Sequence, residues 1–229
     1  MIKSKKLSKF KNIEHAFFNR QGGKSKGIYK SLNCGIGSLD KKKNVLNNLK
    51  IVIKKINPNI KNIVLPNQIH SNKFYYIDKR LKSKKKKFKC DAIITNQKNI
   101  PIGILTADCV PILIYEKNKN MIAAIHAGWK GAYKDIIKKV IKFMIKNGCK
   151  PKAMTAVIGP CISEKNYEVK KDFIDKFIKK DKKNKIFFKK TKNKIFFSLN
   201  KYVYYQLKSL KIKNIEIINK DTFDIKNNF

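Results

Sequence analysis

The chain has 229 residues, of which 42% are hydrophobic, and its formal net charge is +40 at pH 7. This apolar content is enough for a folded core, which argues against a disordered chain. A charge of this size often indicates a nucleic-acid partner, but only Arg20 and Arg80 are arginines and the lysines are spread throughout, so we expect a solvated basic surface and no specific nucleic-acid partner.

The first part of the sequence alternates between short β-type segments and one helix. Apolar, β-branched segments predict strands over residues 14–18, 63–70 and 73–78. Apolar residues at helical spacing predict a helix over 45–56, which Asn57 and Pro58 end. A glycine-containing loop follows the first strand at 19–27, and the lysine-rich segment 79–89 predicts a solvated loop.

The middle and the end of the chain are more apolar. Closely spaced β-branched segments predict buried strands over 90–96, 100–109, 110–116 and 121–127. A helix is predicted over 132–147, with Asn147-Gly148 as its stop signal. The remaining pattern predicts strands over 153–159, 194–199 and 214–219, and helices over 169–180 and after Asn200. Because neither a repeat nor a linker interrupts this pattern, we predict one mixed α/β domain over residues 1–229.

The cysteines give an indication of the compartment. The chain has an odd number of them at irregular spacing, namely Cys34, Cys90, Cys109, Cys149 and Cys161. This argues against a secreted disulfide framework and favours a reducing compartment, so we expect the cytoplasm. The first residues contain no apolar signal-peptide core, and lysines interrupt every apolar run, so we expect neither an export signal nor a membrane partner.

Three side chains with metal-binding chemistry lie where predicted strands end. These are His70, Cys109 and His126, and strand ends are where rigid folds present functional groups. The separation of Cys109 and His126 leaves room for a strand pair that returns to the same edge. Two imidazoles and a thiolate match a catalytic zinc site, which keeps a fourth position open to activate water. Without a CxxC or HExxH pattern, however, spacing alone favours a buried cysteine and two core histidines.

Further candidates surround these three residues. Asp108 is a carboxylate in an apolar segment, so it either moves protons, supports a metal ligand or caps a turn. Arg20 precedes a pair of glycines, which suits a phosphate site as well as a plain surface position. Trp129, within AGWKG at 127–131, either walls a pocket for a planar base or packs in the core. Cys161 has no histidine nearby in the sequence, so we interpret it as a structural cysteine.

The motifs together resemble a known family. In chain order they are NRQGGKS, SLNCG, PNQIHS, CDAIITN, TADCVPILI, AAIHAGWKG and IGPCISEKNYEV. They resemble the YfiH/laccase-domain family, also called DUF152 or polyphenol oxidase-like, over nearly the whole chain. The TADC-P and HAGW motifs are the most specific of them. The resemblance implies one α/β domain whose mixed sheets pack as a sandwich flanked by helices.

The resemblance also implies a function. It implies one zinc ion held by His70, Cys109 and His126, and activity on purine nucleosides with phosphate. We expect the protein to be a monomer. The reactions implied are phosphorolysis of adenosine, inosine, guanosine and methylthioadenosine, and deamination of adenosine. Cys109, Asp108 and Arg20 are then the catalytic candidates. Arg20, which matches the arginine of a family T-R-x-G-G motif, and Trp129 are the candidate substrate contacts.

Three features depart from the family pattern. Ser71 stands where glycine usually follows the motif histidine, and Lys130 replaces the arginine of G-W-R-G, which keeps the charge but loses the bidentate fork. The sequence also ends at Phe229, before the arginine-containing tail of the family. We therefore expect a laccase-like domain without that tail.

Other functions stay open on the sequence alone. Copper-dependent polyphenol oxidation, the first activity assigned to the family, ranks below zinc chemistry because three histidines are too few for a multicopper oxidase. Hydrolytic editing of a cell-wall precursor, proposed for some relatives, is another enzymatic alternative. The non-enzymatic alternative is a basic protein that binds polyanions, which predicts strongly salt-dependent binding.

Overall fold

The computed structural model describes residues 1–78, 88–191 and 193–229, and its centre is a mixed sheet of six strands. The sheet order is β1-β2-β4-β3-β5-β9. The strands are β1 Phe74–Ile77, β2 Ala92–Thr95, β3 Val110–Glu116, β4 Met121–Ala127, β5 Met154–Ile158 and β9 Asn214–Ile217. Both edge strands run parallel to their neighbours, whereas the inner pairs are antiparallel. The predicted mixed α/β class is confirmed.

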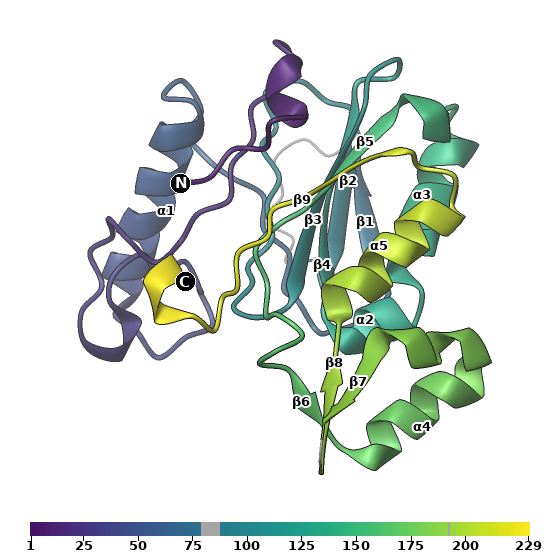
Figure 1. Ribbon diagram of the computed structural model, residues 1–229. Coiled ribbons are helices and arrows are strands. Elements are labelled where there is room, and N and C mark those ends of the chain that lie inside the picture. Colours follow the sequence, from purple (N-terminus) through teal and green to yellow (C-terminus); the bar gives the residue numbers. More distant parts are fainter. Residues whose placement is uncertain (79–87, 192) are drawn as a thin grey trace.

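Within the described residues, five α-helices and a second sheet complete the architecture (Figure 1). Its three antiparallel strands, in the order β6-β8-β7, are β6 Glu168–Val169, β7 Phe188–Thr191 and β8 Lys194–Phe197. The described helices are α1 Lys42–Ile56, α2 Trp129–Tyr133, α3 Ile136–Lys146, α4 Lys171–Lys180 and α5 Leu199–Ser209. None of the helices in the described ranges combines the length and the apolar character that crossing a bilayer requires.

The large sheet is covered on both faces because side chains alternate along each strand. In β3, Ile112 and Ile114 belong to the main core, together with the apolar face of α3 and residues of α5. Tyr115 points to the other face, where it packs with Leu7 and Phe17 of the N-terminal segment. Figure 1 shows α3 and α5 along one side of the sheet, with α1 and the N-terminal segment on the other.

Most predicted elements are confirmed, and β3 and β4 have the predicted bounds. The single helix predicted over 132–147 is wrong. The segment forms α2 and α3, because Asp135 between them adopts a left-handed conformation with φ of 64° that ends regular helical geometry. The short strands β6 and β7 are additional elements that the sequence did not predict.

Three predicted strands are also wrong. Residues 14–18, 63–70 and 100–109 form only isolated bridges, such as the one between Val64 and Ile102. Pro66 removes a backbone donor from the second segment. The Gln68 side chain donates to the carbonyl of Leu105 and accepts from its amide, at 2.7 Å in each case, so it replaces the partner strand. Of the predicted basic loop 79–89, residues 79–87 lie outside the described residues.

Asn48 of α1 fixes the glycine-containing loop that carries Arg20. This side chain is fully buried, and its amide nitrogen lies 2.8 Å from Ser25 Oγ and 2.8 Å from the carbonyl oxygen of Asn33. Its oxygen accepts from the backbone amide of Lys24 at 2.7 Å. One helix residue thus satisfies polar groups from several turns of the loop and holds the loop against α1.

We expect Asn48→Ala to lower the free energy of unfolding by roughly 1–3 kcal/mol, because it leaves buried polar groups without partners. Urea unfolding measures this change. Asn47→Ala is the matched control, since no side-chain hydrogen bond of Asn47 occurs within the described part of the chain. Equal stability of the two variants would contradict the anchoring role of Asn48.

Candidate metal centre

The pairing of β3 with β4 brings Cys109 close to His126. Val110 lies opposite Ala127 and Pro111 opposite His126, so Cys109, directly before β3, reaches the end of β4. The prediction that a strand pair returns the chain to this edge is confirmed. The prediction that Cys109 ends a strand is wrong, because residues 100–109 do not form one and Cys109 instead precedes β3.

His70 reaches the same place from a loop before β1. Its backbone φ is 54°, a sparsely populated left-handed conformation. The carboxylate of Asp91 stabilises this turn by accepting the backbone amides of Ile69 at 3.2 Å, His70 at 2.9 Å and Ser71 at 2.6 Å. The prediction that His70 ends a strand is therefore also wrong, since a buried carboxylate and not a sheet ladder holds the loop.

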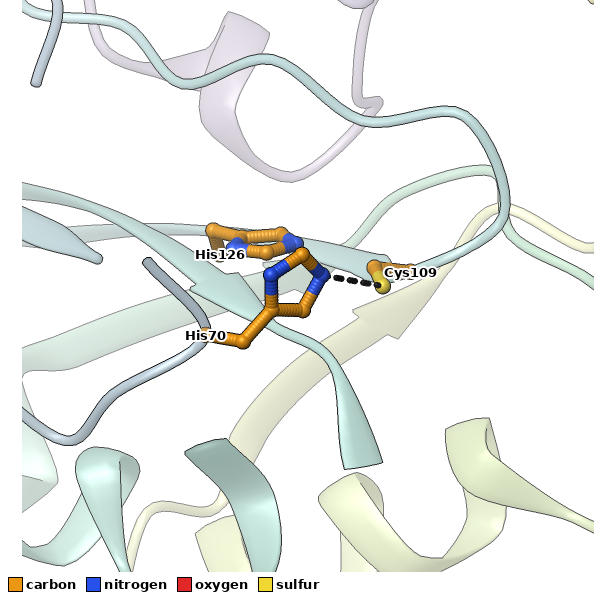
Figure 2. Close-up of side chains that lie close together, drawn as sticks. All are labelled: His70, Cys109 and His126. Carbon is orange, nitrogen blue, oxygen red and sulfur yellow. Dashed lines mark hydrogen bonds between the residues drawn. The ribbon is translucent and has the colours of Figure 1, made fainter. Parts of the chain in front are cut away.

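The three predicted ligands lie together (Figure 2). Their ligand atoms all lie within 4.8 Å of one another, and Cys109 Sγ is 4.0 Å from His70 Nε2. The two imidazole rings are nearly perpendicular, with centroids 4.8 Å apart. His70 is exposed, Cys109 is half-buried and His126 is buried, so the cluster opens to solvent on the His70 side.

This donor set fits a zinc ion. Zinc bonds of about 2.0–2.1 Å to nitrogen and 2.3 Å to sulfur put tetrahedral donors about 3.3–3.6 Å apart. The 4.0 Å separation of Cys109 Sγ and His70 Nε2 is only slightly wider. The half-exposed edge leaves room for a fourth ligand, as catalytic zinc sites require. Imidazole and thiolate also bind copper, so the geometry alone does not select the metal.

Asp91 is the residue of this centre that the sequence reasoning missed. It is fully buried, and besides the three loop amides it contacts Ser71 Oγ at 2.7 Å and His126 Nδ1 at 2.9 Å. The backbone amide of His126 also donates to the carbonyl of Asp91 at 2.7 Å. Because Asp91 is bonded to Nδ1 of His126, the other ring nitrogen, Nε2, is left to bind a metal. An aspartate directly before the buried strand in CDAIITN was the available signal.

The hydrogen bonds between Asp91 and its neighbours keep the Asp91 carboxylate ionised. Burial by itself raises the pKa of Asp91, but hydrogen bonds from His126 and Ser71 outweigh it and lower the pKa to about 2. Burial likewise lowers the pKa of His126, but Asp91 and Cys109 raise it above its usual range. Ser71, the residue expected from the sequence to depart from a motif glycine, supplies one of these hydrogen bonds through its hydroxyl.

Gly128 is required for the close approach of two ligands. A Cβ atom at this position would lie 2.9 Å from Cys109 Sγ and 3.1 Å from His70 Cδ2. Gly131 has a related role one helical turn later, because a Cβ there would lie 2.9 Å from the carbonyl oxygen of Ser71. The glycines of AGWKG therefore let the start of α2 pack against the His70 loop.

Asp108 lies beside the cluster on the exposed side. Its Oδ1 accepts from Thr222 Oγ1 at 2.8 Å, and its backbone carbonyl accepts from the amide of Ile162 at 3.0 Å. The expectation of an apolar, buried setting is wrong, because Thr106, Ala107 and Asp108 are all exposed. Solvent and the C-terminal segment, and not burial, surround this carboxylate.

Arg20 and Trp129 contact other parts of the protein than Asp108 does. The Arg20 side chain is exposed, and its Nε donates to the carbonyl of Lys30 at 2.8 Å. Trp129 is half-buried and packs edge-on against Phe173, with ring centroids 5.0 Å apart. The ammonium groups of Lys130 and Lys176 lie 5.6 and 5.3 Å from the centre of the indole ring. These contacts favour a packing role for Trp129, and its contact with substrate stays a prediction.

Cys161 has the properties of a structural thiol. It is buried, and that burial raises the pKa of its thiol to about 12. The thiol is therefore protonated at neutral pH and a poor nucleophile. The interpretation of Cys161 as structural agrees with this environment.

Comparison with known proteins places the chain in a family. Residues 14–229 match the family described as multi-copper polyphenol oxidoreductase laccase. The chain belongs to this family. Solved structures agree in fold. A Bacillus licheniformis protein called YfiH has a TM-score of 0.85 at 24% identity over 92% of this chain and 83% of that one. A Neisseria meningitidis protein described as DUF152 has a TM-score of 0.80 at 27% identity, over 89% and 81% respectively.

Relatives in this family have names from nucleoside chemistry. A Bacteroides thetaiotaomicron protein named purine nucleoside phosphorylase is 34% identical over 77% of this chain and 68% of its own length. The Bacillus subtilis protein named purine nucleoside phosphorylase YlmD is 32% identical over 72% of this chain. That match spans 62% of the Bacillus protein, less than two thirds of its length. A protein named adenosine deaminase RL5, from an unknown prokaryotic organism, is 29% identical over 77% of this chain and 71% of its own length.

We expect Asp91→Asn to weaken zinc affinity by about 10–100-fold, because the partner that orients His126 loses its charge. Competition with a chromophoric chelator measures the affinity. Asp172→Asn, at an exposed position in the first turn of α4, is the matched control. An unchanged affinity in the folded Asp91 variant would refute the orienting role.

Gly128→Ala tests the close approach of Cys109 and His70. The added methyl group meets both side chains, so we expect a loss of zinc affinity while the protein stays folded. Gly37→Ala is the matched control, because a Cβ at Gly37 meets no atom within 4 Å. Chelator competition and circular dichroism on the same samples separate loss of the site from loss of the fold. Wild-type affinity in Gly128→Ala would contradict the steric argument.

Proposed function

We propose that this chain is a zinc-dependent enzyme that acts on purine nucleosides. Its reactions are the phosphorolysis of adenosine, inosine, guanosine and methylthioadenosine, and the deamination of adenosine. The observation that carries the proposal is the cluster of His70, Cys109 and His126, whose ligand atoms lie within 4.8 Å of one another. The names of the relatives, purine nucleoside phosphorylase and adenosine deaminase, support the substrate class.

We infer the side from which a substrate approaches from the burial of the three ligands. His126 is buried, whereas His70 is exposed and Cys109 half-buried, so the nucleoside approaches over the His70 side. When bound there, zinc supplies a Lewis acid with one coordination position open to a reactant. Asp91 keeps His126 in place throughout, since it is fully buried and its bond to the His126 ring is buried as well.

The remaining roles fall to Asp108, Arg20 and Trp129. In phosphorolysis a phosphate oxygen bonds to C1′ of the ribose, the bond from C1′ to the purine nitrogen breaks, and the purine takes up a proton. In deamination water adds at C6 and ammonia leaves. We assign the proton transfers to the exposed carboxylate of Asp108, next to Cys109. Arg20 binds the phosphate through its terminal guanidinium nitrogens, and Trp129 contacts the base.

The strongly basic surface supports phosphate as a co-substrate. The formal net charge of +40 creates a positive potential that raises the local concentration of small anions. This electrostatic attraction comes from the total charge and does not depend on any one lysine, and it weakens as the ionic strength rises. We therefore assign the lysines to attraction of the anion, and its orientation to Arg20.

Copper-dependent phenol oxidation is the second candidate, favoured by the description of the family. The chain has three histidines, and His15 is not available as a ligand because its Nε2 accepts the backbone amide of Ser4 at 2.8 Å inside the protein. The two histidines that are left suit one metal ion and not a multicopper centre. Metal analysis together with a phenol-oxidation assay distinguishes this candidate from the nucleoside enzyme.

The deciding experiment is a nucleoside assay on zinc-loaded protein. We expect adenosine to give adenine and ribose 1-phosphate with phosphate present, and inosine through deamination. Cys109→Ala removes the thiolate ligand, so we expect it to lose both bound zinc and turnover by at least about 100-fold. Chromatography of the products and elemental analysis of the protein provide the measurements.

Cys34→Ala is the matched control for this substitution. Cys34 is half-buried, and burial raises the pKa of its thiol to about 11, so its removal leaves the metal and the activity unchanged. Nucleoside turnover by zinc-free Cys109→Ala at the wild-type rate would overturn the proposal. Salt-dependent binding of nucleic acid without any turnover would favour the polyanion-binding alternative.

A further inference from the structure

The C-terminal strap, residues 221–228, passes beside the candidate metal centre. Where it begins, it pairs with the loop after β5. The amide of Cys161 donates to the carbonyl of Lys220, and the amide of Thr222 donates to the carbonyl of Cys161, each at 3.2 Å. These two bonds form an isolated parallel bridge, which fixes the path of the strap next to the β5 loop.

Asp221 anchors the strap more firmly than backbone pairing alone. Its Oδ2 accepts from Ser163 Oγ at 2.5 Å and from Asn166 Nδ2 at 2.6 Å. Its Oδ1 accepts from the backbone amides of Ser163 at 3.1 Å and Phe223 at 3.0 Å. Four donors on one carboxylate hold the neighbouring residue, Thr222, in a defined place.

Thr222 uses this fixed position to contact Asp108. Its hydroxyl donates to Asp108 Oδ1 at 2.8 Å, and Asp108 is the residue directly before the ligand Cys109. No hydrogen bond from elsewhere in the described ranges reaches the second oxygen, Oδ2, which lies on an exposed side chain. One carboxylate oxygen is therefore held and the other faces solvent, as a group that exchanges protons with a substrate requires.

The other end of the strap connects to the Arg20 loop. The backbone amide of Arg20 donates to the carbonyl of Asn228 at 2.9 Å, and Asn227 Nδ2 donates to the carbonyl of Asp221 at 2.9 Å. Figure 1 shows this end of the chain beside the N-terminal loop. The same short segment thus contacts Asp108 at one end and Arg20 at the other.

We propose that Thr222 is a positioning residue of the enzyme, which acts by orienting the Asp108 carboxylate beside the metal centre. Asp221 and the strap hold Thr222 in place, and the contact with Arg20 sets where the phosphate-binding loop lies relative to that carboxylate. This inference rests on the proposed function, because it takes Asp108 as the group that moves protons.

Thr222→Val and Thr222→Ser test the inference directly. Valine keeps the shape but removes the donor, so we expect kcat for adenosine phosphorolysis to fall about tenfold with KM changed less than about twofold. Serine keeps the hydroxyl, and we expect it to restore kcat to within about twofold of the wild type. Thr191→Val makes the same change at an exposed position of β7, away from the strap, so it is the matched control and keeps kcat.

A double-mutant cycle shows whether Thr222 acts through Asp108. In an Asp108→Ala background, Thr222→Val causes no further loss of kcat. Should the valine variant fail to fold, Thr222→Ala takes its place in the same cycle. Independent, multiplicative losses, a wild-type kcat in Thr222→Val or an equal loss in Thr191→Val would each overturn the inference.

A second measurement does not depend on turnover. Without the Thr222 bond we expect faster amide hydrogen exchange at Ile162, whose amide donates to the carbonyl of Asp108, in the metal-free protein. Zinc affinity stays within about twofold of the wild type. Unchanged exchange overturns the inference. Absence of nucleoside turnover in the wild type refutes the proposed function instead, and the exchange experiment still shows whether Thr222 holds Asp108.

Discussion

The candidate metal centre depends on one buried carboxylate. Asp91 has no exposed surface, yet it accepts hydrogen bonds from the backbone of the His70 loop, from the Ser71 hydroxyl and from the His126 ring. A buried charge is tolerated only when it is paired and hydrogen-bonded, and here every partner belongs to a segment that carries or flanks a ligand. The same bonds that stabilise the charged Asp91 carboxylate also fix the left-handed turn at His70 and direct Nε2 of His126 toward the cluster.

The rest of the site is built on the exposed side of this anchor. Cys109 and Asp108 lie where the chain enters β3, the glycines of AGWKG leave space for them, and the strap that contains Asp221 and Thr222 passes over the same edge. Asp91 thus anchors the buried side, whereas loops build the exposed side. This division suits a centre in which a buried anchor orients the ligands and exposed loops contact the substrate.

The family description and the names of the relatives indicate different chemistry. The description refers to multi-copper oxidation, and the names refer to purine nucleosides. The ligand count separates them physically, because a cluster of two histidines and one cysteine holds a single ion, and the remaining histidine, His15, is bonded inside the N-terminal segment. One ion with an open position is suited to hydrolytic or phosphorolytic chemistry, whereas four-electron oxidation needs several coppers.

The sequence by itself determined the elements whose apolar pattern is long and regular, including α1, β3 and β4, and it singled out His70, Cys109 and His126 as ligands through motif resemblance. Only the tertiary structure decided what holds these ligands together. Segment 100–109 looks like a strand but is a loop, because the Gln68 side chain takes the hydrogen bonds of Leu105. Asp91 and Thr222 gained their roles from partners far away in the chain, and local pattern carries no information about such long-range hydrogen bonds.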